Sequence, residues 1–161
     1  MYICYSYHDY RKEFYVRVHK IFPKLSDALA YAQSLADEDD VHDRYLQHKG
    51  QHYDAKKRAS NYDRIAVDSI STHLDKPGND VKPGTTMYVV YHYHDYRKDN
   101  YVKFRAAFNI EEKALEVAAE LGDGKISRAE YACHEGELFD QKVKGSNYGR
   151  IAVDPVPVGD Y

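Results

Sequence analysis

The chain of 161 residues carries 23 lysine and arginine residues against 26 aspartate and glutamate residues, which gives a formal net charge of −3. Neither sign dominates, and this excludes both a protein that wraps DNA by bulk charge and an acidic mimic of nucleic acid. The 17 tyrosines and the lack of tryptophan favour a protein with contact surfaces, because tyrosine joins an apolar ring to a polar hydroxyl.

The cysteine content and the hydropathy indicate a cytoplasmic protein. The two cysteines, Cys4 and Cys133, do not form the framework of a disulfide-stabilised domain, which fits a reducing compartment. No apolar run approaches the roughly 18 residues of a transmembrane helix. Arg11 and Lys12 come too early for the apolar core of a signal peptide. We therefore expect no membrane partner.

Two strands joined by a polar turn are predicted at the start of the chain. Residues 2–7 alternate in character, the polar residues 8–12 form the turn, and residues 16–22 alternate again, which predicts a β-hairpin. A second hairpin of the same kind is predicted at 88–108. The side chains expected to face the core from the second strand of each hairpin are Val16, Val18, Phe22, Val102, Phe104, Ala106 and Phe108.

A helix is predicted after each hairpin. Alanine and leucine recur there at helical spacing, and the side chains expected to be buried on the sheet are Ala28, Leu29, Ala32, Leu35, Ala114, Leu115, Ala118 and Leu121. Ser26 and Asn109 precede these stripes and are the expected N-caps.

The segments that follow the helices each contain a His-x-Gly motif between short runs of residues, at 45–54 and at 131–140. We interpret each as a second hairpin with glycine at its turn; a short helix that ends at Gly50 is the alternative. A final strand is predicted at 64–70. Each unit therefore reads ββαβββ, and two Lys-Pro-Gly turns within residues 71–86 are typical of a linker.

The whole pattern occurs twice, 86 positions apart. The string Tyr-His-Asp-Tyr-Arg-Lys at 7–12 recurs unchanged at 93–98. Ser-Asn-Tyr, one variable position and Arg-Ile-Ala-Val-Asp, at 60–68, recur at 146–154. Aligned without gaps, 30 of the first 75 positions are identical to their counterparts. We interpret this self-similarity as an internal duplication.

The fold class predicted is α+β, a tandem duplication of a small antiparallel sheet with one helix. The first repeat spans 1–70, the linker 71–86 and the second repeat 87–161. Because a domain of this size buries only about 60% of its unfolded surface, we expect the two repeats to share an interface as a pseudo-twofold pair.

The repeated polar strings are the strongest candidates for a site. If the final strand pairs antiparallel with the first, its start lies beside the end of the first strand, and the polar residues of both copies gather there: His8, Arg11, Asn61, Tyr62, Arg64, His94, Arg97, Asn147, Tyr148 and Arg150. A histidine beside a carboxylate can serve as a general base, and paired arginines can hold a phosphate or carboxylate. The structural alternative is that these residues stabilise turns, with Arg64 paired to Asp9 or Asp68.

A second candidate is the outward face of the second strand in each repeat. Its basic residues, which follow Tyr15 and Tyr101, are Arg17, His19, Lys103 and Arg105. Aromatic and basic side chains that alternate on a sheet can stack bases and hold phosphates. A solvated strand face and a seam between the repeats are the alternatives.

No cofactor or metal is predicted. Zinc needs three or four converging ligands, and the closely spaced histidine pairs are not kept between the copies: Ser6 stands where the second copy has His92, and Leu138 where the first has His52.

We therefore predict a non-catalytic binding or interaction protein, which engages a protein partner or an anionic ligand such as a nucleotide or nucleic acid, and which can also self-associate as a homo-oligomer. The alternative is an enzyme, a phosphoester hydrolase or transferase that uses His8 or His94 with Arg11 or Arg97.

Overall fold

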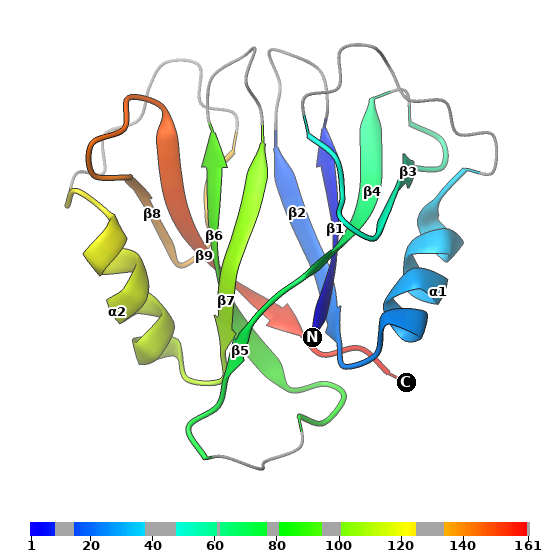
Figure 1. Cartoon of the computed structure of the whole chain (residues 1–161), viewed down its shortest axis with the longest axis horizontal. Coiled ribbons are helices and arrows are strands. Elements are labelled where there is room, and N and C mark those ends of the chain that lie inside the picture. The colour runs from blue at the N-terminus through cyan, green and yellow to red at the C-terminus, as the bar shows by residue number, and fades with distance from the viewer. Residues whose placement is uncertain are drawn as a thin grey trace.

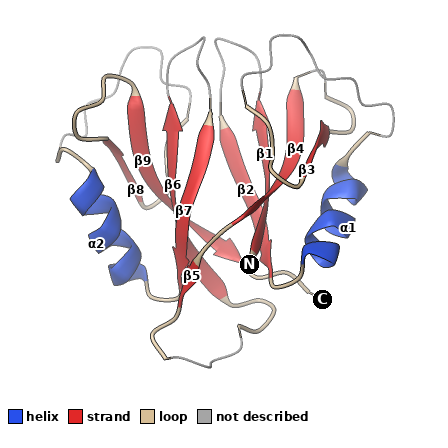
Figure 2. Cartoon of the chain, in the orientation of Figure 1, coloured by secondary structure: helices blue, strands red, loops and turns tan. Residues whose placement is uncertain are grey.

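The computed structural model places seven segments of the chain, and everything below concerns residues 1–8, 15–37, 48–60, 62–76, 81–94, 101–124 and 134–160. The fold is α+β, with two sheets and two helices, and strands make up most of the regular structure (Figure 2). Neither of these helices is long and apolar enough to cross a membrane.

The first sheet contains four antiparallel strands. Along the chain they are β1 (Tyr2–His8), β2 (Val16–Phe22), β3 (Tyr53–Lys56) and β4 (Asp63–Ser69). Across the sheet their order is β2-β1-β4-β3. The final strand β4 pairs antiparallel with β1, with Tyr7 opposite Arg64. This confirms the pairing on which the predicted polar cluster depends.

The second sheet has the order β5-β7-β6-β9-β8. Its strands are β5 (Thr72–His73), β6 (Thr86–His94), β7 (Val102–Phe108), β8 (Phe139–Lys142) and β9 (Gly149–Pro157). Tyr93 lies opposite Arg150, at positions 86 residues after Tyr7 and Arg64. The three antiparallel pairings of the second sheet, β6 with β7, β6 with β9 and β8 with β9, thus use the same register as the three pairings of the first sheet.

The two sheets face each other and the two helices lie on the outside, so that the layers run α2, sheet, sheet, α1 (Figure 1). Side chains of both sheets form the central core, and its largest fully buried members are Tyr5, Tyr7, Tyr91 and Tyr93. Smaller cores lie under α1 (Leu25–Leu35) and α2 (Glu111–Leu121). Because a buried tyrosine hydroxyl needs a hydrogen-bond partner, this central core must also contain polar groups.

A β-bulge corrects the predicted inward faces. Cys4 of β1 pairs with Lys20 of β2, but the next residue, Tyr5, pairs with Val18. His19 is therefore the extra residue, and the alternation of β2 changes phase there. Ile21 therefore reaches the central core, while Phe22 lies under the helix.

The same shift occurs in β6 between Val90 and Tyr91, where Arg105 is the extra residue of β7. Ala107 takes the central position that was predicted for Ala106 and Phe108, and Phe108 packs under α2.

The helices also differ from the prediction in detail. Ala28, Ala32, Ala114 and Ala118 are fully buried, whereas the four leucines of the stripes are half-buried at the flanks of the two contacts. Small side chains at the centre let each helix approach its sheet closely. The expected caps are wrong: the N-cap positions are Lys24 and Ile110, without a side-chain hydrogen bond.

In their described parts, the segments after the helices contain one strand each, where two were predicted on the two sides of the glycine. β3 and β8 begin three residues after Gly50 and Gly136, and each pairs with the strand that follows it in the chain. Residues 48–52 are not in a strand; residues 45–47 and 131–133 lie outside the described segments.

The ends of β4 and β9 cross between the sheets. After β4 the chain enters β5, within the predicted linker, which pairs in parallel with Ala107 and Phe108 of β7. After β9, Val158 forms a parallel bridge with Ile21 of β2, and the Gly159 N–H donates to the Ile21 carbonyl at 2.8 Å. Each sheet therefore receives an edge segment from the chain that leaves the other.

Candidate functional site

The predicted polar cluster of the first half forms where β1 ends and β4 begins. His8 lies opposite Asp63, with 2.5 Å between His8 Nδ1 and Asp63 Oδ1. The imidazole stacks on the ring of Tyr15, with centroids 5.2 Å apart and an interplanar angle of 19°, and Tyr62 meets it edge-on at 5.9 Å. Burial and then a hydrogen bond to Asp63 raise the pKa of Tyr15 to about 12. The result is a histidine–carboxylate pair enclosed by aromatic rings.

The second half repeats the aromatic part of this cluster. His94 stacks on Tyr101 at 5.2 Å and meets Tyr148 edge-on at 5.9 Å. Gly149 lies opposite His94, where the first half has Asp63. The carboxylate of the first cluster therefore has no counterpart at this position.

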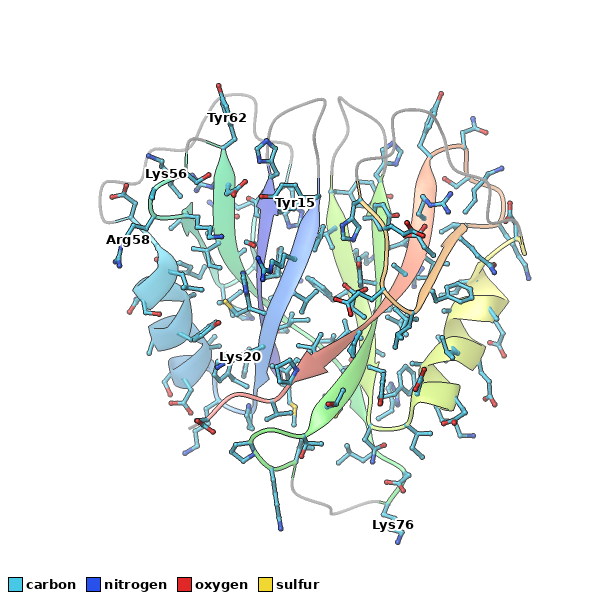
Figure 3. All side chains as sticks on the ribbon, turned by 180° about the vertical axis from the view of Figure 1, so that it is seen from behind. Tyr15, Lys20, Lys56, Arg58, Tyr62 and Lys76 are labelled. Atoms are coloured by element: carbon cyan, nitrogen blue, oxygen red, sulfur yellow. The ribbon has the colours of Figure 1, made fainter. Side chains whose placement is uncertain are left out.

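Both clusters lie at the same end of the two sheets, at the top of Figure 1. We name this surface the aromatic rim; its described members are His8, Tyr15, Tyr62, His94, Tyr101 and Tyr148. Tyr62, Tyr101 and Tyr148 are 41%, 36% and 38% exposed, and among the described residues only Leu138, at 40%, is a comparably exposed large apolar side chain. Figure 3 shows Tyr62 pointing away from the end of β4. The rim therefore presents tyrosine rings to solvent.

The two predicted arginines of the final strands do not join the rim. Arg64 and Arg150 are only 5% and 4% exposed. The Arg64 guanidinium donates from Nε and from an Nη to Asp54 Oδ1, both at 2.8 Å, and Arg150 Nε donates to Asp140 Oδ1 at 2.5 Å. Asp54 and Asp140 are partners that the sequence did not identify.

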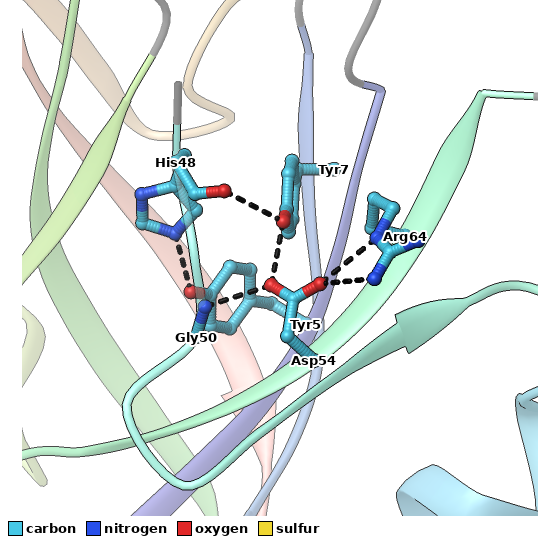
Figure 4. A network of polar contacts seen from close by, with 6 residues as sticks. All are labelled: Tyr5, Tyr7, His48, Gly50, Asp54 and Arg64. Carbon is cyan, nitrogen blue, oxygen red and sulfur yellow. Dashed lines mark hydrogen bonds and ion pairs between the residues drawn. The ribbon is translucent and has the colours of Figure 1, made fainter. Parts of the chain in front are cut away.

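These ion pairs belong to a buried polar network between the sheets (Figure 4). The Tyr7 hydroxyl lies 2.5 Å from Asp54 Oδ2, and the Gly50 N–H donates to the same oxygen at 2.7 Å. The Tyr5 hydroxyl lies 2.7 Å from His48 Nε2 and 3.0 Å from an oxygen of Asp68. Buried carboxylates that accept several hydrogen bonds and an arginine are fully compensated.

The same network occurs in the second half with the same kinds of contact. Its distances are 2.5 Å from the Tyr93 hydroxyl to Asp140, 2.7 Å from the Tyr91 hydroxyl to His134 Nε2, and 3.0 Å from the Tyr91 hydroxyl to Asp154. Every member has an identical residue 86 positions away, and the first set is Tyr5, Tyr7, His48, Gly50, Asp54, Arg64 and Asp68. A sequence signal was therefore present in the repeated His-x-Gly and the aspartate four residues beyond it. What joins that motif to the tyrosines of the first strand is tertiary structure.

The two histidines also connect the sheets. The N–H of Val102, in the second sheet, donates to His48 Nδ1 at 3.5 Å, and the N–H of Val16, in the first, donates to His134 Nδ1 at 3.3 Å. Because Nδ1 accepts in each case, the proton of a neutral ring sits on Nε2 and is donated to the tyrosine oxygen. Burial, opposed by the charge of Asp54, lowers the pKa of His48 to about 4. The network thus joins one sheet to the other through neutral imidazoles. Its polar groups form hydrogen bonds with one another.

The predicted basic residues of β2 and β7 fall on two separate outer faces. His19 Nε2 lies 3.0 Å from the Ser6 hydroxyl, and its ring lies near Tyr31 of α1, which places it on the helix side of the first sheet. Lys103 lies opposite His92, on the helix side of the second sheet. The four predicted residues Arg17, His19, Lys103 and Arg105 therefore make two surfaces.

Three predicted site residues, Arg11, Asn61 and Arg97, lie outside the described segments, and Asn147 is exposed on the turn before β9. Within the described segments, no group of three or more histidine, cysteine, aspartate or glutamate side chains is arranged to hold a metal ion.

No protein-family model matches the chain, and neither the curated proteins nor the solved structures contain a significant match. The chemistry of the site therefore carries the functional argument.

Proposed function

We propose that this chain is a non-catalytic binding protein, built from two copies of one duplicated unit and engaging a protein partner or an anionic ligand. In this proposal, residues 1–70 and 87–161 are the repeats, 71–86 is the linker, and the repeats form a pseudo-twofold pair. The observation that carries the proposal is the aromatic rim, where both halves present exposed tyrosines beside a repeated histidine.

A protein partner is the binding target that the rim favours most. Tyrosine is enriched in protein interfaces, since it covers a large contact area and has few rotatable bonds to immobilise. The rings of Tyr62 and Tyr148 are further restrained by edge contacts with His8 and His94, which lowers the entropy lost on binding. Because the two halves present similar clusters, a partner with two equivalent features fits the rim best.

An enzyme is the second candidate, and one observation favours it. The 2.5 Å contact between His8 Nδ1 and Asp63 is the geometry in which a carboxylate orients a histidine as a general base. A phosphoester hydrolase or transferase would then use His8 in the first half, where the second half has Gly149 in place of the aspartate.

Substitution of the rim tyrosines tests the binding proposal. Tyr62→Ser and Tyr148→Ser together should abolish capture of the partner found by crosslinking the wild-type chain in its host extract. The matched control is Leu138→Ser, which removes a comparably exposed apolar side chain before β8 and should leave capture unchanged. Equal loss in both variants contradicts the rim as the binding surface. Hydrolysis of a generic aryl phosphate that disappears in Asp63→Asn supports the enzyme instead.

A further inference from the structure

Each outer face carries an arrangement of cations around one histidine. In the first half the ring is His19, which Ser6 fixes at 3.0 Å. Burial, and then the charges of Lys57 and Arg17, lower its pKa to about 4. Arg17 lies opposite the same Ser6 that contacts the His19 ring. We name Arg17, His19 and Lys57 the first basic strip.

The second half reaches the same arrangement with different residues. The ring is that of His92 in β6. Burial, and then the charges of Arg105 and Lys103, lower the pKa of His92 to about 4. The repeat places Ser6 at the position of His92, and His19 at the position of Arg105. We name His92, Lys103 and Arg105 the second basic strip. The halves have exchanged which strand supplies the histidine, yet each keeps one neutral imidazole beside two cations.

The cations of both strips have no acidic partner within the described part of the chain. The ion pairs found there involve other residues, although the chain as a whole carries more acidic than basic residues. Like charges gathered without a counter-ion repel each other, and Arg17, Lys103 and Arg105 are exposed. Such a group is stabilised by an anion with several oxygens, as in a phosphate.

The shape of each strip selects an extended ligand. In the first half Tyr15 directly precedes β2 and Arg17 follows two residues on. In the second half Tyr101 directly precedes β7, and Lys103 and the bulge residue Arg105 follow. Residues two apart in extended backbone stand roughly 6–7 Å apart on one face. The tyrosine lies at the rim end in both cases, and Tyr101 is 36% exposed. A row of cations that ends in an aromatic ring matches a backbone of phosphates with an unpaired base to stack.

We infer that the two basic strips bind the phosphate backbone of single-stranded nucleic acid, one segment on each outer face. This deepens the anionic-ligand part of the proposed binding function, and it rests on residues other than the exposed tyrosines tested above. If the protein binds only through its rim, the inference about the basic strips is unsupported. If the rim experiment fails, that inference still stands.

A fluorescent oligothymidylate of about eight nucleotides, within the site size of a small sheet surface, tests the inference. The wild-type chain should bind two copies, with an affinity that falls as salt rises. Arg17→Ala combined with Lys103→Ala removes one cation from each strip. It should weaken binding at each site about tenfold or more and flatten the plot of log affinity against log salt by about 0.7 per site, the value for one lost phosphate contact on a single strand.

The control removes the same charge elsewhere. Lys76 and Lys82 are exposed within residues 71–86, and Figure 3 shows Lys76 at the end opposite Tyr62. Lys76→Ala with Lys82→Ala should leave both affinity and salt slope as in the wild type. Equal weakening in the two double variants, or no binding by the wild type, overturns the inference. Inorganic phosphate that competes as well as the oligonucleotide at equal phosphate concentration also overturns it, because the site would then take free phosphate only.

Discussion

Acid should loosen the contact between the two sheets through His48. Its Nδ1 accepts the Val102 N–H of the opposite sheet, so a second proton on the ring would set one donor against another. The pKa of His48 falls from the ordinary 6.5 to about 4 through burial. At roughly 1.4 kcal/mol for each pH unit of difference between the unfolded and folded values, protonation lowers the free energy of unfolding by about 3 kcal/mol.

The sign follows from the direction of the change. A histidine whose pKa is lower in the folded protein contributes its full stability above pH 6.5, and this contribution is lost as the pH falls through about 4. His19 and His92 act in the same direction, because burial lowers the pKa of each to about 4. Burial raises the pKa of Asp68, and uptake of its proton offsets part of the loss.

Urea unfolding followed by circular dichroism between pH 7 and pH 4 measures this effect. In His48→Gln, the difference in unfolding free energy between the two pH values should be smaller than in the wild type by about 3 kcal/mol. Lys49→Ala, which changes an exposed neighbour, should keep the wild-type pH dependence. An unchanged pH dependence in His48→Gln would refute the neutral, cross-sheet role of this ring.

Other substitutions probe the network and the core. Gly50→Ala should lower the free energy of unfolding by roughly 1–3 kcal/mol, because its methyl group would collide with the backbone oxygen of Tyr53; unaltered urea unfolding would show that the loop can move to make room. Asp54→Asn should cost roughly 3–5 kcal/mol, since it leaves Arg64 buried without its carboxylate, and a loss below 1 kcal/mol in the same assay contradicts the pairing. Cys4 should resist iodoacetamide at pH 8 in the folded protein and react in urea, because burial raises the pKa of its thiol to about 12; mass spectrometry of the labelled peptide decides.

Local patterns in the sequence predicted the elements but not the faces of every side chain. Alternation identified β1, β2 and their partners in the second half, and helical spacing identified α1 and α2. The bulge at His19 changes the phase of β2 by one residue, so Ile21 reaches the central core where Phe22 was predicted to face inward. A single extra residue leaves the composition of a strand intact, and for this reason the sequence does not reveal it.

The candidate site was predictable in part for the same reason. Antiparallel pairing of the first and final strands brought His8 close to Tyr62, as the sequence predicted. Its carboxylate partner Asp63 was not predicted. The network around Asp54 joins residues more than 40 positions apart in the chain, and no local pattern connects them. Identity between the two halves of the sequence marked those residues as constrained without showing whether a fold or a ligand constrains them. The structure places them between the sheets.

The crossed ends of β4 and β9 have a consequence for self-association. Two similar sheets in one chain bring similar strand edges close together. Exposed edges can pair with the wrong strand, in the same molecule or in another, and so cause aggregation. β5 covers the edge of β7, and the bridge at Val158 covers the edge of β2. The opposite edges are β3 and β8, each only four residues long, which offers little template for another strand. Because the chain crosses in this way, backbone N–H and C=O groups at the edges of β2 and β7 form hydrogen bonds within the same molecule. The path of the chain therefore disfavours filaments in which copies add to one another edge to edge.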